Sequence, residues 1–246
     1  MTEVPLDVHP IEAESYRILR SRVDLSALPP LSRAVTERVI HATADFDYTT
    51  DLVCDEAALA AGVAALRRGA RAVADVAMVA SGITGYPVIC KVGDSLAIRL
   101  ARTTGITVSA AAIRLAFGEA GPGAVWVVGC APTALEEILR REVEPALVIG
   151  VPVGFVGAAA SKQALRASRL PALSNVSEKG GSAVAVAAFN ALLRAAQPEK
   201  AQPETGRGEG LSEPKGRGTA WTDERGTSEE GRRRLEAPRR RAGDTA

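Results

Sequence analysis

Two short apolar segments, each followed by a glycine-containing turn and a helix pattern, constrain the fold of this chain most strongly. Residues 124–128 (AVWVV) precede the turn 129–131 and a helix pattern over 133–141. Residues 146–150 (ALVIG) precede a second glycine-rich turn and a helix from about residue 158. Strands without polar alternation, separated by helices, are typical of a parallel sheet that is buried on both faces.

The same alternation of patterns extends through most of the chain. We expect further helices at 11–22, 31–44, 55–68, 94–104, 108–117 and 182–194, and further strands at 72–78, 87–92 and 170–176. These elements predict an α/β domain with three layers, a mostly parallel sheet with helices on both faces, Rossmann-like in appearance. Such sheets bind ligands at the carboxyl ends of their strands, which here carry glycine-containing turns.

The composition changes abruptly at residue 197. Residues 197–246 contain eleven basic and ten acidic side chains, and their large apolar residues are only Leu211, Trp221 and Leu235. Such a segment buries too little apolar surface to offset its ordering entropy, so we predict an α/β domain over 1–196 and a disordered tail over 197–246. Its arginine runs are compatible with a solvated tail or with contact to an acidic partner.

Charge and residue usage exclude several classes of protein. The net charge of +1 from 30 basic and 29 acidic residues does not indicate a nucleic-acid-binding protein. Two histidines cannot build a multi-histidine metal site, and three cysteines without CxxC spacing indicate a reducing compartment. The N-terminus has no signal-peptide pattern, and no apolar stretch is long enough to span a membrane. We therefore expect a soluble cytoplasmic protein without a metal or cofactor.

His41 is the strongest candidate for acid–base chemistry. It lies near the end of a predicted helix, where Glu37 and Arg38 share its face. A carboxylate stabilises the imidazolium and a cation opposes it, which would place the proton equilibrium near neutrality. From the residues alone, the simpler interpretation is a partly exposed histidine near the helix end that interacts with the helix dipole.

Glycine-rich turns are the candidate anion sites. The turn Gly150-Val-Pro-Val-Gly154-Phe-Val-Gly157 matches neither GxGxxG nor a P-loop, so it predicts either an anion site or a tight connection. Ser182, after Gly181, can cap the last helix, whose free N–H groups can meet a carboxylate. Thr84 follows a predicted strand, whereas Ser15 and Ser109 have simpler surface and helix-start interpretations. Cys130 is predicted to be a small packed cysteine.

Seven segments, in this order, resemble the precorrin-8X methylmutase family of corrin biosynthesis. They are HPIEAESYRIL, RVIHATAD, DVAMVASGIT, TVSAAAIRL, GCAPTALEEIL, GVPVGFVGAAASK and EKGGSAVAVAAFNALL, and they run from about residue 9 to 194. The resemblance implies a homodimeric α/β enzyme that moves a methyl group from C11 to C12 of precorrin-8X, giving hydrogenobyrinic acid. In the anaerobic branch the substrate, cobalt-precorrin-8, carries cobalt.

The resemblance also assigns residues. It places the family's proton donor on His41 and implies that Ser15, Arg38, Thr84 and Ser109 line the substrate pocket. Gly154, Gly181 and Ser182 are expected to hold the peripheral carboxylates of the substrate. A suprafacial 1,5-methyl shift needs no nucleophile, metal or cofactor, so a single proton donor and a shaped pocket suffice.

Three residues depart from the family pattern. Val108 stands where the family usually has Arg, Cys130 where it has Asn, and Ala160 where it has Glu. The arginine would contact a polyanionic substrate, so its loss predicts weakened binding with retained activity. Two alternatives remain: a non-catalytic corrinoid binder or carrier, and an unrelated nucleotide-binding protein, which the missing P-loop and dinucleotide fingerprint oppose.

Overall fold

The computed structural model describes residues 10–141 and 143–197. Backbone contacts divide the chain into a unit over 1–200 and a second unit over 201–246. The predicted disordered tail from residue 197 therefore lies, apart from Gln197, outside the described residues. All described residues belong to the first unit.

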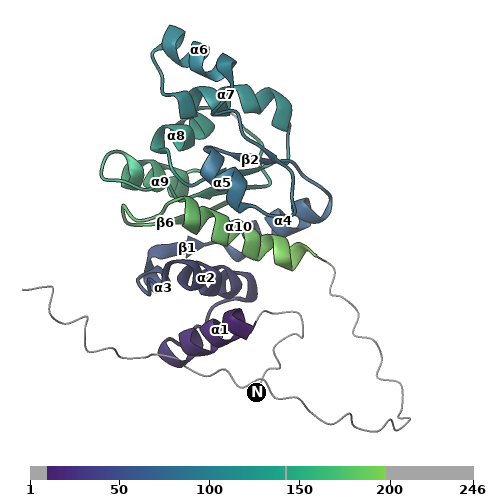
Figure 1. Ribbon diagram of the computed structural model, residues 1–246, viewed down its shortest axis with the longest axis vertical. Coiled ribbons are helices and arrows are strands. Elements are labelled where there is room, and N and C mark those ends of the chain that lie inside the picture. The colour runs from purple at the N-terminus through teal and green to yellow at the C-terminus, as the bar shows by residue number, and fades with distance from the viewer. Residues whose placement is uncertain (1–9, 142, 198–246) are drawn as a thin grey trace, which may run out of the picture. The chain divides into compact units, whose positions relative to one another are not determined.

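A single six-stranded sheet forms the centre of the domain (Figure 1). Its strands are β1 (Leu52–Cys54), β2 (Ala72–Ala74), β3 (Val88–Ile89), β4 (Val125–Val128), β5 (Leu147–Gly150) and β6 (Ala172–Asn175), in the order β1-β6-β5-β4-β2-β3. All neighbouring pairs are parallel except β1 and β6, in which Val53 faces Ser174. The predicted mostly parallel α/β fold is confirmed.

Ten helices in the described residues connect and cover the strands. They are α1 (Pro10–Arg22), α2 (Pro30–Thr43), α3 (Tyr48–Asp51), α4 (Glu56–Arg67), α5 (Ala77–Gly82), α6 (Ser95–Thr104), α7 (Val108–Ala120), α8 (Pro132–Arg140), α9 (Ala158–Ala167) and α10 (Ser182–Ala196). Buried residues of α4, α5 and α10 pack on one face of the sheet and those of α7, α8 and α9 on the other.

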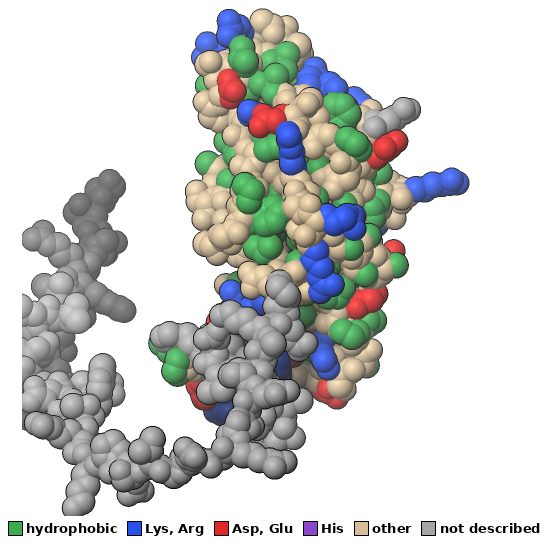
Figure 2. Space-filling view, turned by 90° about the vertical axis from the view of Figure 1, so that its right-hand side faces the viewer, with side chains coloured by type: hydrophobic (Ala, Val, Ile, Leu, Met, Phe, Trp, Pro, Cys, Tyr) green, Lys and Arg blue, Asp and Glu red, His purple; other side chains and the backbone are tan. Residues whose placement is uncertain are grey.

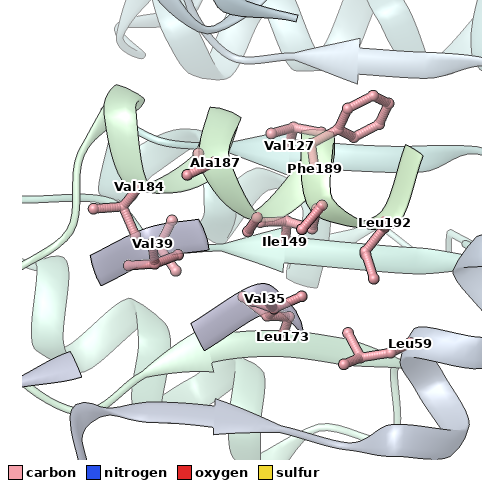
Figure 3. Packing of buried hydrophobic residues seen from close by; sticks show 14 of the residues in the cluster. Val35, Val39, Leu59, Val127, Ile149, Leu173, Val184, Ala187, Phe189 and Leu192 are labelled. Carbon is pink, nitrogen blue, oxygen red and sulfur yellow. The ribbon is translucent and has the colours of Figure 1, made fainter. Parts of the chain in front are cut away.

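The α10 side of the sheet carries additional layers. Alternate strand residues such as Val127 and Ile149 meet Ala187 of α10, and Val35 and Val39 of α2 pack against the same cluster (Figure 3). α1 lies on the outer side of α2 (Figure 1) and has a single buried residue, Leu19. The helix that carries His41 is thus enclosed between α10 and α1.

Two local predictions were wrong. The predicted strand 72–78 ends at Ala74. The carboxylate of the next residue, Asp75, accepts hydrogen bonds from the turn 129–131, and Ala77–Gly82 form α5. α3 and the antiparallel edge strand β1 were not predicted, and strand β3 is only two residues long.

The surface agrees with the balanced composition. On the part of the face that Figure 2 shows without grey atoms, Lys and Arg side chains lie among acidic and apolar ones. In the described residues no single helix has the length and apolar character to span a bilayer; α6 and α7 reach them only together, and they meet at 118°.

Candidate active site

His41 lies in the last turn of α2, and two neighbouring residues of α1 hold its ring. The Ser15 hydroxyl oxygen is 2.7 Å from Nδ1 of His41, and the Tyr16 ring stacks on the imidazole at a centroid distance of 5.0 Å and an interplanar angle of 15°. Within the described residues, Nε2 of His41 has no hydrogen-bond partner. The side chain is half-buried. Ser15 therefore orients the imidazole through Nδ1, and among the residues that the structure describes Nε2 is the nitrogen left for proton transfer.

The carboxylate that faces His41 comes from a different helix than expected. Glu37, the predicted partner, instead accepts two hydrogen bonds from Arg20, at 2.9 and 2.8 Å. The carboxylate that acts on His41 is instead that of Glu12 on α1. It accepts hydrogen bonds from Arg38, one turn before His41, and from Arg194 of α10 at 3.2 Å. The expectation that Glu37 influences the pKa of His41 was wrong, because the Glu37 carboxylate is bonded to Arg20 and the carboxylate that acts on the imidazole is that of Glu12.

The charges around His41 favour the neutral ring in the free protein. Burial lowers the pKa of His41, the Arg38 guanidinium lowers it further, Glu12 opposes this, and Arg194 adds to the lowering. The imidazolium form is therefore lost as pH rises through a value below the usual range for histidine. A ligand that neutralises these arginines would restore the charged form.

We expect the imidazole of His41 in the free protein to titrate below a pKa of about 6.5. The measurement is the pH dependence of its Cε1 proton resonance, which is simple to assign because the chain has two histidines and His41→Gln removes one of them. A pKa at or above the ordinary value would show that burial and Arg38 do not control this ring.

A hollow of about 880 Å³ opens between α1, α2 and α10. Its walls include five arginines, namely Arg17, Arg20, Arg33, Arg38 and Arg194, against the acidic residues Asp24 and Glu37. His41 is not itself a wall residue, but Tyr16, which stacks on the imidazole, is. A smaller hollow of about 210 Å³ shares Arg38, Asn190 and Arg194 with the first and adds Thr84. The volume suits a large ligand, and the cations suit an anionic one.

The structure therefore brings together Ser15, Arg38 and His41, with Thr84 at the adjoining hollow. Sequence reasoning missed Tyr16, Glu12 and Arg194. Glu12, Ser15 and Tyr16 have the i, i+3 and i+4 spacing that places side chains on one helical face, which was an available signal. No sequence signal connects Arg194 with Glu12, because the contact spans 182 residues.

The remaining predicted residues lie at the carboxyl edge of the sheet, as expected for this fold. Gly154 follows β5, Gly181 and Ser182 follow β6, and Ser109 is the second residue of α7. Thr107, the N-cap of α7, bonds to Thr133 in the first turn of α8 at 2.7 Å, so Ser109 belongs to the same edge. In the described residues, no group of three His, Cys, Asp or Glu side chains is arranged to hold a metal.

The glycine N–H groups are not available to a ligand in this arrangement. The N–H of Gly154 donates to Glu178 O at 3.1 Å, and that of Gly181 donates to Val151 O at 2.9 Å. Gly180 has a φ of 145°, and a Cβ there would lie 2.2 Å from Val151 O, so only glycine allows this close approach. Ser182 does not cap α10, since Gly181 occupies the N-cap position and Ser182 is the first helical residue.

A buried network holds the 176–181 segment in place beside α2. Lys162 is fully buried and donates to Asn175 Oδ1 at 3.0 Å and to Lys179 O at 2.5 Å; burial lowers its pKa to about 8, against the opposing charge of Asp51. The Lys179 ammonium bonds to Asp45, four residues after His41, at 2.8 Å. The start of α10 is therefore tied to the end of the helix that carries His41.

The anion-friendly turn after β4 binds a carboxylate of the protein itself. Asp75 is fully buried and accepts hydrogen bonds from the N–H groups of Gly129, Cys130 and Ala131 at 3.1, 2.8 and 2.8 Å. Cys130 is exposed, so the prediction of a packed cysteine was wrong. Partial desolvation of its sulfur by neighbouring atoms, and then the Asp75 carboxylate, raise the pKa of its thiol. This thiol is not activated as a nucleophile.

Comparison with known proteins identifies the family. The family model for precorrin-8X methylmutase matches residues 10–195. The chain is 42% identical to the cobalt-precorrin-8 methylmutase of Salmonella typhimurium over 195 residues, which cover 74% of this chain and 93% of that protein. It is 39% identical to the precorrin-8X methylmutase of Pseudomonas aeruginosa, over 76% of this chain and 95% of that protein.

The fold leads to the same family. The crystal structure of the precorrin-8X methylmutase from Thermus thermophilus superposes with a TM-score of 0.69 at 36% identity, covering 76% of this chain and 95% of that one. A second solved structure, described as a precorrin-8X methylmutase related protein, has a TM-score of 0.68 at 29% identity. Sequence and fold agree, and the chain belongs to the precorrin-8X methylmutase family.

Proposed function

We propose that this protein is the isomerase that moves the methyl group from C11 to C12 of precorrin-8X, or of its cobalt-containing equivalent, during corrin biosynthesis. The observation that carries the proposal is the imidazole of His41, fixed by Ser15 and Tyr16 beside an arginine-lined hollow of about 880 Å³. A corrin precursor is a large macrocycle with several peripheral carboxylates, and it fits both the volume and the charge of this hollow.

His41 supplies the one chemical group that the rearrangement needs. The protonated Nε2 donates its proton to the macrocycle and selects the reactive tautomer; the C11–methyl bond then breaks as the C12–methyl bond forms, and the proton is returned. Because the reaction is an isomerisation, no atom is gained or lost. Substrate carboxylates near Arg38 and Arg194 would cancel the positive charge that lowers the pKa of His41, so binding itself promotes the imidazolium.

We assign the other residues by their positions. Ser15 orients the imidazole, and Arg38 and Thr84 contact substrate carboxylates from the smaller hollow. Ser109 and Ser182 offer hydroxyl groups and first-turn N–H groups at the carboxyl edge. Gly154 and Gly181 contribute by their small size, which lets the ligand approach the backbone, because their N–H groups have partners.

Val108→Arg is expected to tighten the binding of hydrogenobyrinic acid about tenfold, which is the effect of one charged contact. Val108 is half-buried at the first position of α7, next to Ser109, so a long side chain there extends from the carboxyl edge of the sheet. The measurement is a titration followed by visible absorbance. Leu96→Arg, an equal charge on the exposed surface of α6, serves as the control. Equal affinities of Val108→Arg and wild type would show that this position does not face the ligand.

We further propose that the protein acts as a homodimer in the cytoplasm. Phe155 and Val156, in the turn after β5, are 96% and 89% exposed, which is unusual for large apolar side chains of an isolated chain and suits burial against a second copy. All three cysteines are free thiols, as is usual in a reducing compartment.

The test is to mix the purified protein with precorrin-8X and, separately, with cobalt-precorrin-8, and to follow the visible spectrum. Conversion to the product chromophore in either reaction supports the enzyme and identifies the substrate form. A spectral change that saturates at one equivalent without turnover supports the alternative, a corrinoid binder or carrier. The available Nε2 of His41 favours the enzyme, because a binder needs no proton donor.

A further inference from the structure

Glu12 joins three helices through one carboxylate. Its Oε1 atom accepts hydrogen bonds from Nη1 of Arg38 on α2 and from Nη2 of Arg194 on α10, the latter at 3.2 Å. The side chain is 20% exposed, and although burial raises its pKa, Arg194 and Arg38 lower it to a net value below the usual range. Glu12 is therefore an ionised group that occupies both guanidinium groups.

The two arginines that Glu12 occupies are those at the junction of the two hollows. Arg38 and Arg194 line both the 880 Å³ and the 210 Å³ hollow, whereas Glu12 lines neither. An anionic ligand in this recess thus meets two cations that already hold an internal carboxylate. For the ligand to bind them with full strength, the carboxylate of Glu12 has to leave.

α1 is attached in a way that permits this exchange. Leu19 is its single buried residue. Its further contacts to α2 and α10 include the stacking of Tyr16 on His41 and the polar contacts of Ser15 with His41, of Arg20 with Glu37 and of Glu12 with the two arginines. A helix that buries little apolar surface opens locally at low cost.

We propose that Glu12 is an internal competitor for the carboxylates of the substrate, and that binding replaces it on Arg38 and Arg194. The proposal rests on the proposed function, because it requires a ligand with several carboxylates. One ion pair is exchanged for another, so the site rejects neutral ligands, which offer the two arginines no anion in place of Glu12.

The experiment is a titration of wild type, Glu12→Gln and Glu119→Gln with hydrogenobyrinic acid, followed by visible absorbance. Glu12→Gln is expected to lower the dissociation constant about tenfold, since the two arginines no longer carry an internal anion. It is also expected to lower KM for precorrin-8X without raising kcat. Glu119→Gln also removes a paired carboxylate, bonded to Lys91 at 2.6 Å, but neither residue lines a hollow, so this variant is expected to stay within twofold of wild type.

An unchanged or higher dissociation constant for Glu12→Gln overturns the inference, because it would show that Glu12 positions the arginines for the substrate. Should Glu12→Gln not fold, Glu12→Asp retains the charge but is one methylene too short to reach both arginines; tighter binding than wild type supports the inference, and equal or weaker binding overturns it. If wild type itself neither binds nor converts a corrin polycarboxylate, the proposed function fails, and the inference fails with it.

Discussion

Replacement of His41 by glutamine is expected to lower kcat for precorrin-8X by about three orders of magnitude, the usual contribution of a positioned proton donor. Glutamine retains a hydrogen-bonding group that can reach the Ser15 hydroxyl, which lies 2.7 Å from Nδ1 in the native protein, but it cannot transfer a proton near neutral pH. The decrease in kcat therefore measures the contribution of proton transfer separately from that of side-chain packing. The measurement is the initial rate of product formation at saturating substrate.

Two comparisons make this result specific. The affinity of His41→Gln for hydrogenobyrinic acid is expected to stay within a few-fold of wild type, because the arginines of the hollow are unchanged. Ser15→Ala, which removes only the hydroxyl that orients the ring, is expected to reduce kcat by about tenfold. A His41→Gln protein that turns over within tenfold of wild type would remove His41 from the chemistry.

Replacement of Asp75 by alanine is expected to reduce the free energy of unfolding by about 3–5 kcal/mol. The Asp75 carboxylate is fully buried and satisfies three backbone N–H groups in the turn before α8, which all lose this partner in the variant. Its charge also lies at the N-terminal end of α8, where the helix dipole favours an anion. The measurement is urea-induced unfolding, with the midpoint and the m-value compared with those of wild type.

Asp55→Ala is the matched control for Asp75→Ala. Asp55 caps α4 by accepting hydrogen bonds from the N–H groups of Ala57 and Ala58 at 2.9 and 3.3 Å, but it faces solvent, so water can replace the lost contacts. Its removal is expected to cost about 1 kcal/mol, as for an ordinary N-cap. Equal losses in the two variants would show that burial of the Asp75 carboxylate does not stabilise the turn.

The sheet and most helices could be predicted from the sequence because their signals are local. Segments such as 124–128 are apolar, short and bounded by turns, and the observed strand β4 agrees with the prediction to within one residue. The prediction for the segment around Asp75 was wrong because the contact that ends the strand is not local. The segment's apolar pattern continues to Met78, and only the distant turn at Gly129 explains why the strand stops and α5 begins.

Strand β1 illustrates the same limit at the edge of the sheet. It has three residues, and its pairing with β6 is supported by Asp51, whose carboxylate accepts hydrogen bonds from Val176 and Ser177 at 3.0 and 2.7 Å. These contacts join residues about 125 positions apart, and neither segment alone has a pattern that indicates them.

In the candidate site, too, some residues could be predicted from the sequence and others depend on contacts between distant segments. The family resemblance, which includes the segment RVIHATAD, indicated His41 and Arg38. The Tyr16 ring that stacks on His41 and the Glu12 carboxylate that bonds Arg38 depend instead on how α1 packs on α2. The predicted role of the glycine N–H groups failed because the backbone already satisfies them. A glycine-rich turn in a sequence does not reveal which carbonyl groups will lie opposite it.

The most direct test of the account uses precorrin-8X that carries ¹³C in the methyl group on C11. We predict that wild-type protein shifts this resonance completely to that of a methyl group on C12, with the label retained in the same molecule, and that His41→Gln leaves it unchanged over the same period. A wild-type protein that binds the labelled macrocycle while the label stays on C11 would contradict the claim that this chain is a methylmutase.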